Sequence, residues 1–232
     1  SIASQGNEFK PREYWPKRDD NWKYMGKKDT STVKREKEYT FDVAVIGGGV
    51  AGLCAAVSAA RHGAKTVLVQ NRPVLGGNAS SEIHVPINGS YHFKNKFGVD
   101  RETGIVEEIQ LENRYYNVQN SWEVWDHVMY DYVTRQENLT LMLNTQAMEA
   151  VMDGNSIKKA ICFQFSTESK IIISADVFID CSGDGALAAS AGAEYRTGRE
   201  GKAEFNEKYA PDEPDGWVMG DSIQFSSKDM GY

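Results

Sequence analysis

Cysteine and histidine are scarce in this 232-residue chain, and their placement excludes two ways of holding a fold together. The three cysteines, Cys54, Cys162 and Cys181, lie in a small-residue segment or in apolar runs. We therefore expect buried, reduced thiols and no disulfide framework. The four histidines are scattered, and none stands at a metal-binding interval from a second ligand. No metal site is expected.

Long apolar runs are missing as well. No segment approaches the roughly 20 apolar residues of a membrane-spanning helix, so we expect a soluble chain without a membrane span. No basic segment followed by an apolar one marks a signal peptide. Because the chain begins at Ser1 rather than Met, earlier removal of such a peptide stays open. The compartment, cytoplasm or periplasm, stays open with it.

Charge is unevenly placed in a chain whose net charge is −7. Residues 1–40 hold ten Lys and Arg against seven Asp and Glu, a net +3 that leaves about −10 for the remainder. The same segment carries Tyr14, Trp15, Trp22 and Tyr24. We predict an N-terminal arm over residues 1–40 that packs on the acidic body through these aromatic residues. Contact with nucleic acid is the less favoured alternative, and we expect no such partner.

The most informative feature is a glycine-rich turn between an apolar strand and a small-residue helix. Residues 42–46 read as the strand, and Gly47 to Gly52 follow as Gly-Gly-Gly-Val-Ala-Gly. This is the G-x-G-x-x-G fingerprint with its required flanks. Gly47 permits the turn, Gly49 lets a pyrophosphate approach the backbone, and Gly52 lets the helix pack closely. The sequence therefore predicts a dinucleotide-binding site.

The second strand, residues 66–70, ends where an acidic residue normally binds the ribose hydroxyls. Gln70 stands at that position, and its amide oxygen is a neutral acceptor. Gln70 carries no charge to repel a 2′-phosphate, and Arg72 follows closely. Taken alone, these two residues favour NADP.

The remaining chain reads as two helices, a set of strands and a second glycine turn. The helices are expected at about 102–116 and 121–136, with Ser121 as N-cap and the apolar stripe of the second helix in the core. Strands follow at 139–143, 147–152, 157–165 and 170–174, with a hairpin turn at 153–155. A last strand, 176–181, enters Ser182-Gly183-Asp184-Gly185 and a small-residue helix. This second turn is expected at the same carboxyl edge of the sheet as the first.

This order of elements resembles the FAD-binding domain of glutathione-reductase-like and fumarate-reductase-like flavoproteins. It is most similar to a bacterial group of FAD-dependent oxidoreductases, some of which carry a xanthan lyase label. The similarity rests on residues 68–82, 102–105, 178–185, 191–196 and 198–200. It implies a Rossmann-like α/β domain over residues 41–200, with a central parallel sheet and an antiparallel β-meander crossover. It also implies FAD as cofactor, since Gln at the ribose position is usual in that group.

The resemblance implies a set of cofactor-binding residues. One group would line the pyrophosphate: Gly47, Gly49, Val50, Ala51 and Gly52. A second would meet the adenosine: Gln70, Asn71 and Arg72 at the ribose, and Ala147 at the adenine through its backbone. A third would approach the ribitol and isoalloxazine: Gly76, Gly77, Asn78, Ala79 and Ser80. The last would close over the pyrophosphate side: Ser182, Gly183 and Asp184.

No catalytic residue can be assigned. Glu82 and His84 follow the flavin loop, the segment from Gly76 to Ser80 that the resemblance places beside the isoalloxazine. Both are suitable acids or bases, but a structural role is equally compatible with their positions. Residues 201–232 are expected to begin a missing C-terminal or substrate region of the same protein, which would make this chain an N-terminal piece of a longer flavoprotein. We expect this piece alone to be inactive.

The leading hypothesis is hydride transfer to FAD from an unknown small-molecule substrate, for which a carbohydrate derivative is one candidate. The alternative is a non-catalytic nucleotide-binding or interaction module associated with polysaccharide processing.

Overall fold

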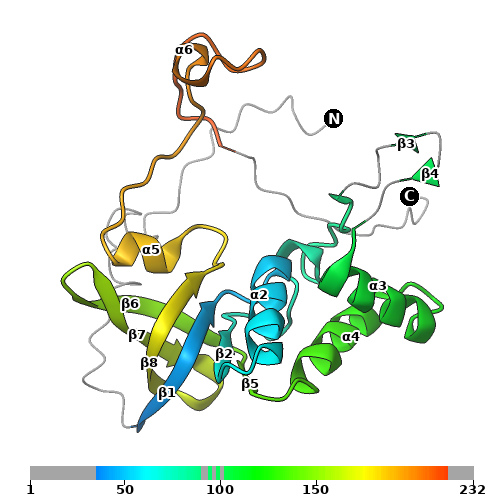
Figure 1. Cartoon of the computed structure of the whole chain (residues 1–232), viewed down its shortest axis with the longest axis vertical. Helices are drawn as coiled ribbons and strands as arrows, with labels where there is room; N and C mark the ends of the chain where they lie inside the picture. The colour runs from blue at the N-terminus through cyan, green and yellow to red at the C-terminus, as the bar shows by residue number, and fades with distance from the viewer. Residues whose placement is uncertain (1–34, 90–93, 96–97, 100–101, 219–232) are drawn as a thin grey trace, which may run out of the picture. The chain divides into compact units, whose positions relative to one another are not determined.

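A six-stranded sheet organises the part of the chain that the computed structural model describes, residues 35–89, 94–95, 98–99 and 102–218 (Figure 1). Its strand order is β5-β2-β1-β8-β7-β6. Four neighbouring strands are parallel: β5 (Leu139–Met142), β2 (Thr66–Val69), β1 (Arg35–Ile46) and β8 (Ser169–Asp180). β7 (Ser156–Gln164) and β6 (Thr145–Asp153) add an antiparallel meander. The predicted fold class is confirmed.

Strands β1 and β8 are longer than the sequence predicted. They pair in parallel from Arg35 opposite Ser169 to Ile46 opposite Asp180. The first half of β8 also pairs with β7, so the two predicted strands 170–174 and 176–181 are one. No glycine or proline interrupts residues 169–180. The side chain of Asp176 is exposed to water, so its charge does not have to be buried within the strand. The start of β1 was missed because its residues 35–40 are exposed and, apart from Tyr39, polar.

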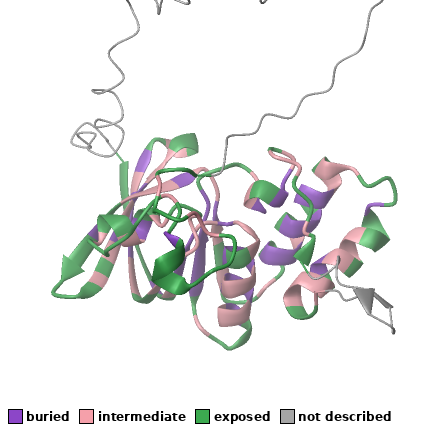
Figure 2. Ribbon diagram, turned by 90° about the horizontal axis from the view of Figure 1, so that it is seen from above, coloured by how far each residue is buried: buried purple, intermediate pink, exposed green. Residues whose placement is uncertain are grey.

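Helices cover one face of the parallel strands. α2 (Val50–Arg61), α3 (Gly104–Tyr116) and α4 (Trp122–Thr134) pack there around Val45 and Leu68. α4 is capped as predicted, because the Ser121 hydroxyl accepts from the Val124 N–H at 3.4 Å. The expected core stripe is confirmed, with Trp125, Met129 and Tyr132 buried. Buried positions lie on the central strands and on the helices beside them (Figure 2).

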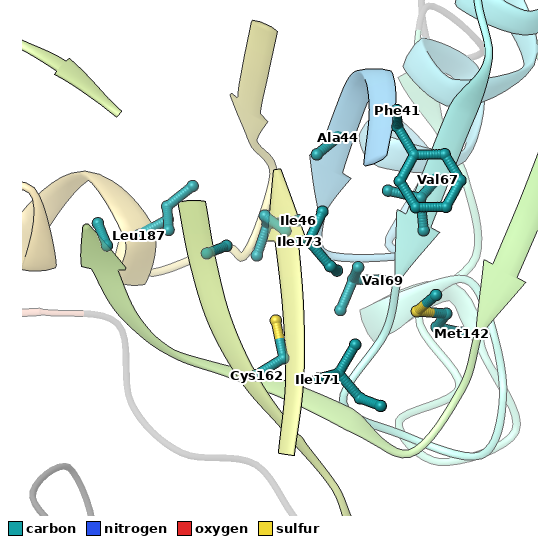
Figure 3. Packing of buried hydrophobic residues seen from close by; sticks show 12 residues of the cluster. Phe41, Ala44, Ile46, Val67, Val69, Met142, Cys162, Ile171, Ile173 and Leu187 are labelled. Carbon is teal, nitrogen blue, oxygen red and sulfur yellow. The ribbon is translucent and has the colours of Figure 1, made fainter. Parts of the chain in front are cut away.

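The opposite face is covered by the meander and by α5 (Ala186–Ser190). Because side chains alternate along a strand, Ala44, Ile46, Val67 and Val69 point to this face while their neighbours point to the helices. Figure 3 shows them packed with Ile171, Ile173, Cys162 and Leu187. Burial on both faces is typical of a parallel sheet.

Short elements complete the described chain. They are the 3-10 turns η3 (Gly77–Ala79) and η5 (Phe165–Thr167), the two-residue strands β3 (Lys94–Asn95) and β4 (Gly98–Val99), and α6 (Lys202–Phe205). The predicted hairpin turn is confirmed, since Asp153 pairs with Ser156 across Gly154 and Asn155. Among described residues, no helix has the length and apolar character needed to cross a bilayer. The predicted arm lies outside the described residues up to residue 34, as does the chain after residue 218.

Candidate functional site

The first glycine turn leaves β1 at the carboxyl edge of the sheet and enters α2. Gly47 has φ +105°, and a side-chain carbon there would lie 2.2 Å from the carbonyl oxygen of Cys181. At Gly52 such a carbon would lie 1.8 Å from the carbonyl oxygen of Gly47. Both positions exclude a side chain because backbone already occupies the space. Gly47 and Gly52 therefore shape the turn and press the helix onto it, as the sequence predicted.

Gly49 differs from these two glycines. It is the N-cap of α2 with φ −63° and ψ 176°, a conformation open to any residue. A side-chain carbon at Gly49 would meet no atom within 4 Å. The space in front of it belongs to a groove, where the first turn of α2 presents N–H groups without intrahelical partners. This end of α2 is suited to an anion.

The groove has a volume of about 860 Å³, within the range of about 300–1,000 Å³ for small-molecule sites. It is lined by the following predicted site residues: Gly47, Gly49, Val50, Ala51, Gln70, Asn71, Arg72, Gly76, Gly77, Asn78, Ala79, Ala147, Ser182, Gly183 and Asp184. Two predicted residues support it from behind. Gly52 is buried under the turn, and the fully buried Ser80 donates its hydroxyl to the Gly77 carbonyl oxygen at 2.7 Å.

Gln70, which was predicted at the ribose, lines the groove and is also hydrogen-bonded within the protein. Its side-chain oxygen accepts from the Gly48 N–H at 2.8 Å, and its amino group donates to the Val74 carbonyl at 3.0 Å. The residue is only 4% exposed. Both ends of the amide are thus used inside the protein, and Gln70 ties the end of β2 to the first glycine turn.

Arg72 is also engaged. Its guanidinium donates to both carboxylate oxygens of Glu82, at distances of 2.7–3.0 Å. Among the described residues that line the groove, Arg72 is the single cation. Hydrogen bonding to Glu82 raises the pKa of Arg72. The arginine that suggested a 2′-phosphate is therefore already neutralised by a carboxylate, which argues against NADP.

The loop after β2 is held between the glycine turn and α4. The Gly76 N–H donates to the Gly48 carbonyl at 2.8 Å. From α4, the Trp125 indole N–H donates to the Ala79 carbonyl at 2.7 Å, and Asp126 accepts from the Ser81 N–H at 3.0 Å. Sequence reasoning treated Trp125 as core and did not consider Asp126. The position of Asp126 beside the apolar residues of α4 was the feature of the sequence that could have indicated this contact.

The second glycine turn lies at the same edge as the first, as predicted, because the Cys181 N–H donates to the Ile46 carbonyl at 2.7 Å. Asp180, which sequence reasoning missed, organises it. One carboxylate oxygen accepts from the N–H and the hydroxyl of Ser182, at 3.0 and 2.6 Å. The other accepts from the Ala188 N–H at 2.8 Å. Burial opposes ionisation, but these hydrogen bonds outweigh it and lower the pKa of Asp180.

The two acid–base candidates, Glu82 and His84, differ in their position relative to the groove. Glu82 lines the groove but is paired with Arg72. His84 is not among the lining residues. Its ring stacks on Trp122 with ring centres 5.0 Å apart and planes 7° apart. Within the described ranges, no three His, Cys, Asp or Glu side chains gather in the manner of a metal site.

The sequence of this chain is similar to a protein family and to parts of several known proteins. A sequence model described as FAD dependent oxidoreductase matches residues 42–229. Fumarate reductase (cytochrome) of Shewanella frigidimarina is 55% identical over 40 residues, which cover 17% of this chain and 7% of that protein. Aerobic glycerol-3-phosphate dehydrogenase of Staphylococcus saprophyticus is 36% identical over 90 residues, covering 36% and 16%. The matched region is thus a small part of each of these relatives.

Solved structures are more distant in sequence. A myxobacterial chondrochloren halogenase, described as a variant of FAD-dependent halogenases, superposes with a TM-score of 0.46 at 11% identity. The superposition covers 69% of this chain and 41% of the halogenase.

Proposed function

The chain belongs to the FAD-dependent oxidoreductase family, and from that membership we propose that its groove binds FAD for hydride transfer from a small-molecule substrate. When bound, FAD supplies the redox chemistry by accepting the hydride, while the protein binds and orients both reactants. The observation that carries the proposal is the open space in front of Gly49, where a pyrophosphate can approach the N-terminus of α2.

We assign the groove residues by their places along it. Gly47, Gly49, Val50 and Ala51 face the pyrophosphate, with Ser182, Gly183 and Asp184 on the other side. Asn71, Arg72 and Ala147 lie at the adenosine end, where Gln70 meets the ribose and also fixes the turn. Gly76, Gly77, Asn78 and Ala79 line the path of the ribitol and isoalloxazine, with Ser80 supporting the loop. Gly52 acts through the packing of α2.

The groove favours FAD over NADP on electrostatic grounds. In sites of this kind, a nearby Arg accommodates the 2′-phosphate of NADP. Arg72 is paired with Glu82, and Glu82 and Asp184 make the described lining acidic. A nucleotide whose only phosphates lie at the helix N-terminus suits this distribution better.

The test is a titration of the purified chain with FAD, followed by flavin fluorescence, with NADP as competitor. We expect FAD to bind and NADP to compete at least tenfold less well. Anaerobic flavin reduction by candidate substrates then tests for an oxidoreductase. NADP binding without FAD binding would overturn the cofactor assignment. Binding of neither nucleotide would favour the alternative, a non-catalytic interaction module.

A further inference from the structure

A second pocket lies between the start of α4, the end of α3 and the chain that follows the flavin loop. It has a volume of about 260 Å³, slightly below the usual range of about 300–1,000 Å³ for small-molecule sites. It shares Ala79 and Pro86 with the cofactor groove, so the two cavities adjoin at the loop expected beside the flavin. α3 and α4 lie side by side (Figure 1).

The polar lining of this pocket consists mainly of side-chain amides. Gln110, Asn113 and Asn117 lie at positions i, i+3 and i+7, one face of α3 and its C-cap. Asn120 follows in the turn. None of the described lining residues carries a charge. A charged ligand would therefore enter the pocket without a compensating partner.

Only part of this amide set is used by the protein itself. The buried Asn117 donates to Asn113 Oδ1 and to the Ser121 carbonyl, at 2.9 and 2.7 Å, and accepts from the Ser121 N–H at 2.8 Å. It holds the turn between the helices. In the described part of the chain, the amides of Gln110 and Asn120 make no side-chain hydrogen bond. Each therefore offers one acceptor and two donor hydrogens.

The apolar lining combines two tryptophans with Ala79, Pro86 and Ile87. Trp122 and Trp125 contribute indole rings, and both are fixed. Trp122 stacks on His84, and Trp125 donates its N–H to Ala79. An indole face is electron-rich and attracts polarised C–H groups.

We propose that this pocket binds one neutral sugar ring. A pyranose carries adjacent hydroxyls, each both donor and acceptor, which match free carboxamides, and an apolar C–H face, which matches an indole. The lack of charge selects against uronates and sugar phosphates. This inference rests on the proposed function, because the sugar would be the substrate, or the part of the substrate that lies beside the flavin loop. Sugar binding itself does not require FAD.

The experiment follows the indole N–H signals of the whole chain by NMR while D-glucose, D-galactose or D-mannose is added to tens of millimolar. We expect at least one sugar to shift the signals of Trp122 and Trp125 and to leave that of the exposed Trp217 unchanged. D-Glucuronate and glucose 6-phosphate should bind at least fivefold less well. No shift with any neutral sugar, or equal binding of the charged sugars, would overturn the proposal.

Two substitutions locate the site. Gln110→Ala removes one free amide, and Asn120→Gly removes the other while retaining the left-handed backbone at φ +53°. Together they should weaken sugar binding at least tenfold. Gln119→Ala, an exposed amide in the same turn that does not line the pocket, is the matched control and should change nothing. Unchanged binding in the double variant would overturn the assignment.

A parallel FAD titration separates the two proposals. Sugar binding without FAD binding would overturn the proposed function and leave this pocket assigned. FAD binding without sugar binding would overturn only the sugar pocket.

Discussion

The three glycines of the fingerprint have different physical roles. Gly47 and Gly52 exclude a side chain because carbonyl oxygens of the protein occupy its place. A side-chain carbon at Gly49, by contrast, would meet no protein atom within 4 Å. The smallness of Gly49 therefore matters for a ligand that approaches the backbone, and the three positions can be separated experimentally.

Gly49→Val should weaken FAD binding at least tenfold with the melting temperature nearly unchanged. The branched side chain would extend into the groove, and loss of about 1.4 kcal/mol of contact already gives a tenfold effect. Flavin fluorescence and thermal unfolding are the measurements. Gly52→Val is the contrasting variant and should unfold the domain, because its side chain would overlap the Gly47 carbonyl. Wild-type FAD affinity in Gly49→Val would contradict the assignment.

Gln70→Glu, which places an acid at the usual ribose position, should lower stability by about 1–3 kcal/mol. The carboxylate could still accept from Gly48 but would lose the donor that satisfies the Val74 carbonyl, 3.0 Å away. Urea unfolding measures the effect. Gln119→Glu, at an exposed position, is the control and should be neutral. A Gln70→Glu protein as stable as the wild type would contradict the structural role of this amide.

Gln70 also shows what spacing along the sequence can and cannot predict. The distance from the glycines identified its position correctly at the end of β2. The direction of its side chain depends on Gly48 and Val74, and this contact with a turn 22 residues away has no signature in the sequence. The position of the Arg72 side chain likewise depends on Glu82, which lies ten residues later in the sequence.

At the scale of elements, amphipathic pattern was sufficient for the helices but not for all strand boundaries. α3 and α4 were predicted within two residues because Ile109 and the Trp125 stripe repeat at helical spacing. The first half of β1 has no such pattern. It is a strand because β8 lies beside it, with Glu36 paired to Lys170 at 2.8 Å. Long-range pairing of exposed residues is decided by tertiary structure.

The second glycine turn should loosen in Asp180→Asn. The amide keeps one acceptor but places a donor against the Ala188 N–H, which costs about 1–3 kcal/mol. We expect weaker FAD binding and lower stability at neutral pH. The folded-state pKa of Asp180 lies below its ordinary value, so its contribution is present above that value and is lost as the pH falls through the folded-state pKa. The variant should therefore lack this part of the acid destabilisation, as unfolding between pH 3 and 7 would measure. Identical pH profiles for both proteins would contradict this role.

Tyr132→Phe tests the junction of three helices. The phenol donates to Glu108 at 2.6 Å and accepts from Arg61 at 2.8 Å, and Arg61 also pairs with Glu108. This contact links α2, α3 and α4. The substitution preserves the buried ring, so a loss of about 1 kcal/mol is expected, as measured by urea unfolding. Tyr130→Phe is the control on the exposed side of α4 and should be neutral. A loss above about 3 kcal/mol would indicate that the hydroxyl supports more than this junction.

At the scale of the whole molecule, electrostatics predict how FAD binding responds to salt. The chain carries a net charge of −7, and Arg72, the one cation among the described groove residues, is paired with Glu82. Backbone N–H groups and the helix dipole are then the main partners of the pyrophosphate. Screening by added salt removes repulsion from the acidic body as effectively as it weakens local attraction.

The dissociation constant for FAD should therefore change less than about threefold between about 10 mM and 0.5 M NaCl. Glu82→Gln provides the opposite case. It removes the negative charge opposite the Arg72 guanidinium, so binding should strengthen at low salt, weaken as salt is added, and extend to NADP through the 2′-phosphate. Titrations of both proteins across the salt range measure these slopes. A wild-type affinity that falls tenfold with salt would mean that an unpaired Lys or Arg contacts the phosphates, and the backbone-based site would be refuted.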